Sequence, residues 1–157
     1  MKILVMGLPG SGKSSIAREL SVAFECAQFN ADDVRKAAND WDFTLDGRLR
    51  QARRMANLAD FEKGNGRTVI CDFVCPTDLT RYIFDADYTI WMDTISSSRY
   101  EDTDKIFEEP EWYDVRIDKW IDLNQLYSYS VGGSRGTEVT PNFLNELFEK
   151  LDKQLSR

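Results

Sequence analysis

The chain of 157 residues contains no histidine, and its three cysteines lack the spacing of metal ligands. A zinc site is therefore not expected, and a Cys–His nucleophile is excluded. The N-terminal apolar stretch is too short for a signal peptide or for a membrane span of roughly 20 residues, so we expect a cytoplasmic protein without membrane contact. Basic residues are in deficit, with 20 Lys and Arg against 27 Asp and Glu. General nucleic-acid binding, which needs a basic surface, is not expected either.

The hydrophobic content of 42% is typical of a folded globular protein. With no internal repeat or linker, the chain is predicted to form one domain over residues 1–157. Short apolar runs alternate with helical patterns, which predicts an α/β fold with a parallel five-stranded sheet sandwiched by helices. The predicted strands are residues 2–6, 26–30, 68–74, 88–92 and 114–117, and the predicted helices are residues 13–24, 45–63, 77–84 and a last one after Pro141.

A phosphate-binding motif follows the first predicted strand. Residues 7–14 read GLPGSGKS and fit the pattern G-x-x-x-x-G-K-[ST] between a strand and a helix. Its glycines let backbone N–H groups point at phosphate oxygens, and the helix N-terminus adds a favourable dipole. Lys13 supplies a charge for the β- and γ-phosphates, and the Ser14 hydroxyl is a magnesium ligand. We therefore predict a P-loop NTPase fold that binds ATP and Mg²⁺ through Gly7, Pro9, Gly10, Ser11, Gly12, Lys13, Ser14 and Ser15.

Residues that follow the other strands are candidates for a second site, because parallel sheets bind ligands beyond the carboxyl ends of their strands. The guanine-reading N-K-x-D segment of GTPases is absent from the sequence. Small P-loop kinases combine a triphosphate site with an acceptor site, and this chain offers residues for both. NADDVR at residues 30–35 follows the second strand, DFVCP at residues 72–76 follows the third, and Phe43 and Arg48 lie between them.

These segments resemble the adenylylsulfate (APS) kinase family, which phosphorylates the ribose 3′-hydroxyl of adenosine 5′-phosphosulfate. The family's D-G-D-N-x-R segment corresponds to residues 30–35, and its arginine-rich block that begins D-L-G-F-S corresponds to residues 40–54. Its F-I-S-P turn corresponds to FVCP at residues 73–76, and its F-V-D-T strand end to WMDT at residues 91–94. The resemblance covers about the first 95 residues. It implies a kinase of sulfate assimilation with a small nucleotide as substrate, and a possible homodimer.

The resemblance also implies a role for each matching residue. Asp32 would orient the acceptor hydroxyl or take its proton. Arg35 and Arg48 would neutralise the phosphosulfate, while Phe43 would stack on the adenine. The remaining residues of the predicted substrate pocket are Gln51, Phe73, Val74 and Cys75. Structural alternatives stay open, with Asp32 as a helix N-cap, Arg48 on a solvated face and Phe43 as core filler.

Several positions depart from the family pattern. Asn30 and Ala31 replace the first Asp and the Gly of D-G-D, and Asp33 replaces an Asn. Asp72 ends an apolar strand where the family usually has a small neutral residue. Many P-loop proteins place a magnesium-binding aspartate there, so we predict Ser14 and Asp72 as metal residues. A simple strand-end cap is the alternative for Asp72.

The family has a lysine-rich mobile lid after its F-V-D-T strand. The corresponding segment here, about residues 96–111, is shorter and largely acidic, and its cations are Arg99 and Lys105. Phosphoryl transfer needs positive charge on the transferred group. Arg99 is therefore the first candidate for that charge and Lys105 the second, with a solvated charge run as the alternative for both.

The main hypothesis is in-line transfer of the ATP γ-phosphoryl group to adenosine 5′-phosphosulfate, with Lys13, Asp32 and Arg99 as catalytic residues. The departures from the family pattern leave two alternatives. One is a P-loop kinase that acts on a hydroxyl of another nucleotide, a nucleoside or a polynucleotide. The other is a nucleotide-binding module that does not transfer phosphate.

Overall fold

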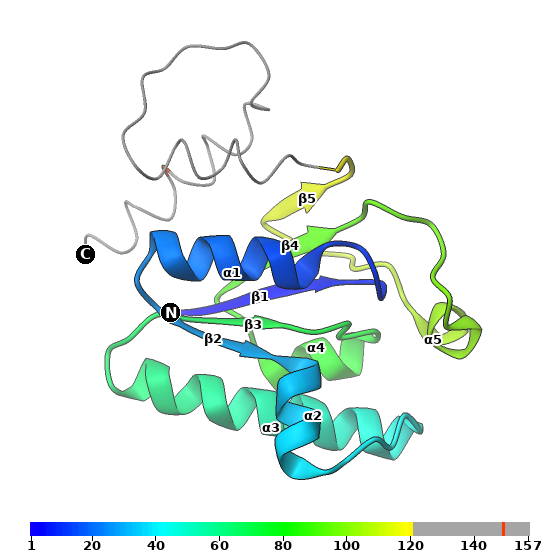
Figure 1. Ribbon diagram of the computed structural model, residues 1–157, viewed down its shortest axis with the longest axis horizontal. Helices are drawn as coiled ribbons and strands as arrows, with labels where there is room; N and C mark the ends of the chain where they lie inside the picture. The colour runs from blue at the N-terminus through cyan, green and yellow to red at the C-terminus, as the bar shows by residue number, and fades with distance from the viewer. Residues whose placement is uncertain (121–148, 150–157) are drawn as a thin grey trace. The chain divides into compact units, whose positions relative to one another are not determined.

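Five short apolar runs form one parallel sheet in the computed structural model (Figure 1). The structure describes residues 1–120 and Glu149, and Met1–Trp120 form one compact unit. The elements are β1 (Lys2–Gly7), α1 (Lys13–Ala23), β2 (Ala27–Asn30), α2 (Ala31–Ala38), α3 (Leu45–Gly64), β3 (Val69–Asp72), α4 (Asp78–Phe84), β4 (Tyr88–Met92), α5 (Glu101–Ile106) and β5 (Val115–Ile117). The helix predicted after Pro141 lies outside the described residues, and a single domain over the whole chain stays a prediction.

The strand order is β2-β3-β1-β4-β5, and every neighbouring pair is parallel. The predicted five-stranded parallel sheet is therefore confirmed. The third strand ends at Asp72, two residues before the predicted end. Helix α5 is not among the predicted helices, because its acidic sequence has no apolar stripe that would indicate a helix. In the described part of the chain, no helix is long and apolar enough to cross a membrane.

The sheet has helices on both faces. Figure 1 shows α1 in front of one face and α3 with α4 against the other. Leu4 and Met6 of β1 pack into one cluster with Met55 of α3 and Phe84 of α4. Alternate residues of a strand point to opposite faces, so the neighbouring β1 residues face α1. A strand buried on both faces explains the continuous apolar sequence of β1.

Strand register brings three chain segments together at one edge of the sheet. Val5 of β1 and Asn30 of β2 are both in register with Asp72 of β3. Because the strands are parallel, the segments that follow them leave from the same edge. The phosphate loop follows β1, and α2 follows β2 without an intervening loop. This edge is where polar and charged side chains gather.

Substitution of Phe84 tests the assignment of the hydrophobic core. Its fully buried ring packs edge-on against Phe73, with ring centroids 5.3 Å apart. We expect Phe84→Ala to lower the free energy of unfolding by about 3–5 kcal/mol, because a cavity replaces the ring. Urea denaturation measures this loss. Tyr82→Ala on the same helix is the control, since Tyr82 is 81% exposed and its loss is expected to change stability by less than about 0.5 kcal/mol. Equal losses in the two variants would contradict this assignment of the core.

Candidate active site

The loop at residues 8–12 turns the chain from β1 into α1, and only glycine fits two of the positions that shape it. A Cβ atom at Gly7 would lie 2.5 Å from the carbonyl oxygen of Met92, and Gly12 has φ of 95° as the N-cap of α1. In the described part of the chain, no side chain caps this helix. The free N–H groups of its first turn therefore form an anion site of the kind that binds phosphate.

Lys13 lies at this helix start with only 9% of its surface exposed. Its Nζ atom donates a hydrogen bond to the Leu8 carbonyl oxygen at 2.8 Å. Burial lowers the pKa of Lys13 to about 8, and the negative charges of Asp72 and Asp32 act in the opposite direction. A buried ammonium in a glycine loop is well suited to bind a polyanion, whose charge would raise this pKa again.

The end of β3 adds a buried carboxylate. Asp72 is 1% exposed and accepts hydrogen bonds from Gln28 Nε2 at 2.9 Å and from Asn30 Nδ2 at 2.6 Å. The same Asn30 nitrogen donates to Ser14 Oγ at 3.0 Å. Burial raises the pKa of Asp72, while hydrogen bonds from these three side chains favour its ionised form. Ser14 and Asp72, the two predicted metal residues, therefore belong to one hydrogen-bonded cluster.

Asp32 is exposed in the first turn of α2, and it is not the cap of that helix. The N-cap is Asn30, whose side-chain oxygen accepts from the N–H groups of Asp32 and Asp33. Burial lowers the pKa of both Lys13 and Arg35, and the negative charge of Asp32 acts against that lowering at each of them. The carboxylate is therefore close enough to act on the phosphate loop and on the arginine of the predicted acceptor site.

Arg35, Phe43 and Arg48 come together as the sequence predicted for an acceptor site. The guanidinium carbons of Arg35 and Arg48 lie 4.4 Å and 5.5 Å from the centre of the Phe43 ring. Both arginines are buried, whereas Phe43 is 47% exposed. The alternatives of a solvated face for Arg48 and core filler for Phe43 are therefore wrong. A half-exposed aromatic ring beside two cations is suited to a planar, anionic ligand.

Arg35 and Arg48 also donate hydrogen bonds to the loop that precedes α3. Arg35 Nη1 donates to the carbonyl oxygens of Asp40 and Asp42 at 2.9 Å and 3.1 Å, and Arg48 Nε donates to that of Phe43 at 2.8 Å. Asp40 in turn accepts from Arg50 and Arg54, and these hydrogen bonds hold its pKa well below the usual range. The loop that carries Phe43 is thus tied to α2 and α3 before any ligand binds.

The acidic segment at residues 96–111 contacts this cluster through α5. Arg48 Nη2 lies 3.0 Å from Thr103 Oγ1 and 3.5 Å from an Asp102 carboxylate oxygen. Arg99 is exposed, and its guanidinium lies over the ring of Tyr100 at 5.1 Å. Lys105 is exposed and pairs with Glu101. The segment therefore reaches the site through an acidic helix, and the catalytic role predicted for Arg99 stays a prediction.

The other predicted substrate residues have partners outside the cluster of Arg35, Phe43 and Arg48. Phe73 and Cys75 have their side chains in the hydrophobic core, where burial raises the pKa of the Cys75 thiol to about 12. The Cys75 carbonyl oxygen accepts from Arg81. Gln51 is buried and donates to the carbonyl oxygen of Ala31, so it supports the start of α2. Val74 keeps partial exposure. Any contact of Phe73 and Cys75 with substrate would therefore have to come from the backbone.

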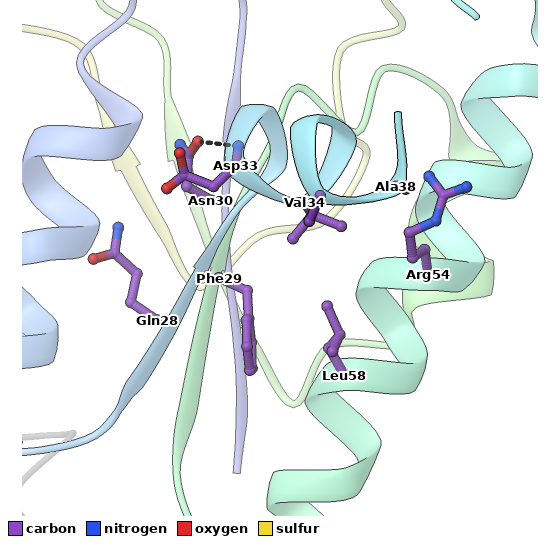
Figure 2. A pocket seen from close by; sticks show the side chains of 9 residues that line it. Gln28, Phe29, Asn30, Asp33, Val34, Ala38, Arg54 and Leu58 are labelled. Carbon is purple, nitrogen blue, oxygen red and sulfur yellow. Dashed lines mark hydrogen bonds between the residues drawn. The ribbon is translucent and has the colours of Figure 1, made fainter. Parts of the chain in front are cut away.

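A pocket of about 480 Å³ opens between β2, α2 and α3 (Figure 2). Phe29, Val34 and Leu58 give it an apolar wall, and Arg54 lies at its end. In Figure 2, Gln28 points to the opposite side of β2 from Phe29, as strand alternation requires. The described residues that line this pocket include none from the phosphate loop. The pocket therefore adjoins the Ser14–Asp72 cluster through Gln28 and Asn30 without including the loop itself.

Three residues at the site were missed by the sequence analysis. Gln28 could have been found, since polar residues at positions i and i+2 of a strand share a face and Asn30 follows at that spacing. Thr103 has no sequence signal, because its role arises only from packing against Arg48. Trp120 has no sequence signal either. Its ring packs close to Gly12 of the phosphate loop, where a Cβ atom would lie 3.1 Å from it.

The family model for adenylylsulphate kinase matches residues 1–94, the range that holds both clusters. The chain belongs to the adenylylsulphate kinase family. A curated relative, the probable adenylyl-sulfate kinase of Aeropyrum pernix, is 36% identical over an alignment of 83 residues that covers 47% of this chain and 44% of that protein. The chain spans less than half the length of the curated relatives it matches.

Solved structures agree with the adenylylsulphate kinase fold. The APS kinase CysC of Mycobacterium tuberculosis, solved in complex with AMPPNP and APS, has a TM-score of 0.66 at 20% identity and covers 85% of this chain and 97% of its own. A sugar kinase from Janibacter has a TM-score of 0.65 at 17% identity, over 83% of this chain and 92% of its own. At these identities the likeness shows the fold, and the predicted P-loop fold is confirmed.

The lowered pKa of Lys13 predicts a dependence of stability on pH in the nucleotide-free protein. Above pH of about 8 the folded state loses this proton, whereas the unfolded chain keeps it up to the ordinary value of 10.5. The unfolded state then binds more protons, so stability rises with pH across that window. Relative to Lys13→Met, the free energy of unfolding is expected to rise by on the order of 3 kcal/mol.

Urea denaturation at intervals from pH 7.5 to 10.5 measures this difference, with other titrating groups cancelling between the two proteins. A difference that stays constant or falls with pH would show that Lys13 remains protonated in the folded state.

Proposed function

We propose that the protein is a Mg²⁺-dependent kinase that transfers the γ-phosphoryl group of ATP to the 3′-hydroxyl of adenosine 5′-phosphosulfate. The observation that carries this proposal is the junction at Asn30. Its amide contacts Ser14 of the phosphate loop and caps helix α2, which carries Asp32 in its first turn and Arg35 three residues later. A carboxylate in that position can serve a hydroxyl that lies between a bound triphosphate and an anionic acceptor.

The donor side fits a magnesium nucleotide. The glycine loop and the uncapped start of α1 offer N–H groups to the phosphates, and Lys13 adds a buried positive charge. Ser14 would be the metal ligand from the loop, with Asp72 beside it. When bound, the metal ion supplies positive charge that neutralises the β- and γ-phosphates.

The acceptor side would hold a nucleotide with an anionic group. The half-exposed ring of Phe43 would stack on the base, and the guanidinium groups of Arg35 and Arg48 would face the phosphosulfate. Asp32 would take the proton of the hydroxyl as its oxygen bonds to the γ-phosphorus. The bond from that phosphorus to the bridging oxygen breaks, and ADP leaves with the electron pair.

A second candidate is a kinase that phosphorylates a less anionic alcohol. Part of the hydrogen-bonding capacity of Arg35 and Arg48 is taken by backbone carbonyl oxygens. Acidic groups also lie close by, since Asp102 pairs with Arg48 and Asp33 is exposed on the first turn of α2. These charges oppose the binding of a phosphosulfate and favour a sugar or nucleoside hydroxyl.

ADP release from Mg·ATP distinguishes the two candidates. We expect release to increase with adenosine 5′-phosphosulfate, and Lys13→Ala and Asp32→Ala each to reduce this increase by at least about 100-fold. The panel also contains nucleosides, nucleoside monophosphates, simple sugars and DNA ends. An increase with a nucleoside or a sugar alone would support the second candidate, whereas an increase with a nucleoside monophosphate or a DNA end alone would contradict both choices of acceptor. ATP binding without acceptor-dependent release would contradict both and favour a nucleotide-binding module.

The role of Phe43 has its own test. We expect Phe43→Ala to raise the KM of the acceptor about tenfold and to leave the KM of ATP unchanged, since base stacking on an aromatic ring contributes about 1–3 kcal/mol. Trp41→Ala is the matched control, because Trp41 lies on the same loop and is 51% exposed. Steady-state kinetics with each substrate varied in turn give both constants. A similar effect in both variants would indicate a general disturbance of the loop.

A further inference from the structure

Asn30 lies where the phosphate loop, the end of β3 and the start of α2 meet. Its Nδ2 atom donates to Ser14 Oγ at 3.0 Å and to Asp72 Oδ2 at 2.6 Å. Its Oδ1 atom accepts from the N–H groups of Asp32 at 3.0 Å and Asp33 at 3.2 Å, the latter drawn in Figure 2. A primary amide has two donor hydrogens and an oxygen with two lone pairs, so its whole capacity is used.

These partners fix the orientation of the Asn30 amide. In the reversed orientation its oxygen would face the carboxylate of Asp72, and its NH₂ group would face two backbone N–H donors. Both contacts would be repulsive, so the network itself decides which atom is the nitrogen. The nitrogen therefore points at the metal residues and the oxygen at the start of α2.

The same network orients the hydroxyl of Ser14. This oxygen accepts from Asn30, and a hydrogen bond with Ser14 favours the ionised form of the Asp72 carboxylate. With its hydrogen directed at Asp72 and one lone pair taken by Asn30, Ser14 Oγ keeps one lone pair for a metal ion. Gln28 holds the other carboxylate oxygen at 2.9 Å, so Asp72 cannot easily turn away.

We propose that Asn30 is a positioning residue that aims the metal-binding lone pair of Ser14, and that it works as an amide–carboxylate pair with Asp72. The proposal rests on the proposed function, because the metal ion binds there together with the nucleotide. The pair needs one amide and one carboxylate in contact, and its geometry accepts either order. An aspartate at position 30 would still cap α2, and an asparagine at position 72 would still accept from Gln28.

Single substitutions break the pair for different reasons. Asn30→Asp places two carboxylates at hydrogen-bond distance and removes the donor to Ser14. Asp72→Asn removes the acceptor for the Ser14 hydrogen and leaves amide groups competing as donors. The double variant Asn30→Asp/Asp72→Asn restores one donor and one acceptor, and its net charge equals that of the natural chain.

The test is binding of the non-hydrolysable analogue AMPPNP, which is measured by calorimetry at a series of Mg²⁺ concentrations. Each single variant is expected to raise the half-saturating Mg²⁺ concentration by at least about tenfold, as the loss of a hydrogen bond to a charged group implies. The half-saturating Mg²⁺ concentration of the double variant is expected to return to within about threefold of that of the natural chain, because the effects of coupled positions are not additive. Asn65→Asp, an exposed asparagine at the end of α3, is the control for the added charge.

The outcomes separate the two proposals. Binding of AMPPNP by the natural chain without any effect of Mg²⁺, or no binding at all, would overturn the proposed function and this inference with it. Normal Mg²⁺-dependent binding, together with an unaffected Asn30→Asp variant or a double variant that shows the summed losses, would overturn the inference alone. Thermal unfolding of all variants shows whether each one is folded.

Discussion

The carboxylate of Asp72 is the group around which the active edge of the sheet is organised. A charged group that is 1% exposed is costly unless hydrogen bonds replace its lost hydration. The donors come from β2 through Gln28 and Asn30 and from α1 through Ser14. They reach Asp72 only because the sheet is parallel and β2 and β3 end in register. The proposed metal site therefore depends on the sheet topology.

The same junction sets the position of the acceptor side. Asn30 caps α2, and α2 carries both Asp32 and Arg35. Arg35 then holds the loop that presents Phe43, while Arg48 connects that loop to α5. The proposed donor and acceptor residues are consequently connected through α2 and the hydrogen bonds at its two ends. A rigid arrangement of this kind suits phosphoryl transfer, where positioning and electrostatics provide most of the catalysis.

Acidic groups surround the proposed acceptor site. The two buried arginines face Asp102 and carbonyl oxygens rather than open solvent. In the segment at residues 96–111, Lys105 is paired with Glu101 and Arg99 is exposed. The positive charge available to an anionic acceptor is therefore partly compensated in this chain. The fold alone does not identify the acceptor. What decides between the proposed acceptors is how much negative charge this partly compensated site can bind.

The sequence by itself determined the phosphate loop, the parallel sheet and the residues of the arginine cluster. These follow from local patterns, namely a glycine motif with fixed spacing, apolar runs of strand length and a match to family segments. The N-cap of α2 could not be predicted from the sequence, because Asp32 and Asn30 are both good N-cap residues. Only the backbone of the structure shows that Asn30 has this role.

Only the tertiary structure decided which distant side chains share hydrogen bonds. The partners Gln28 and Asp72 are 44 residues apart, and Arg48 and Thr103 are 55 residues apart. Helix α5 has no apolar stripe, and its buried residue Thr103 lies against the buried Arg48. Such contacts depend on strand order and register, which local sequence patterns do not specify.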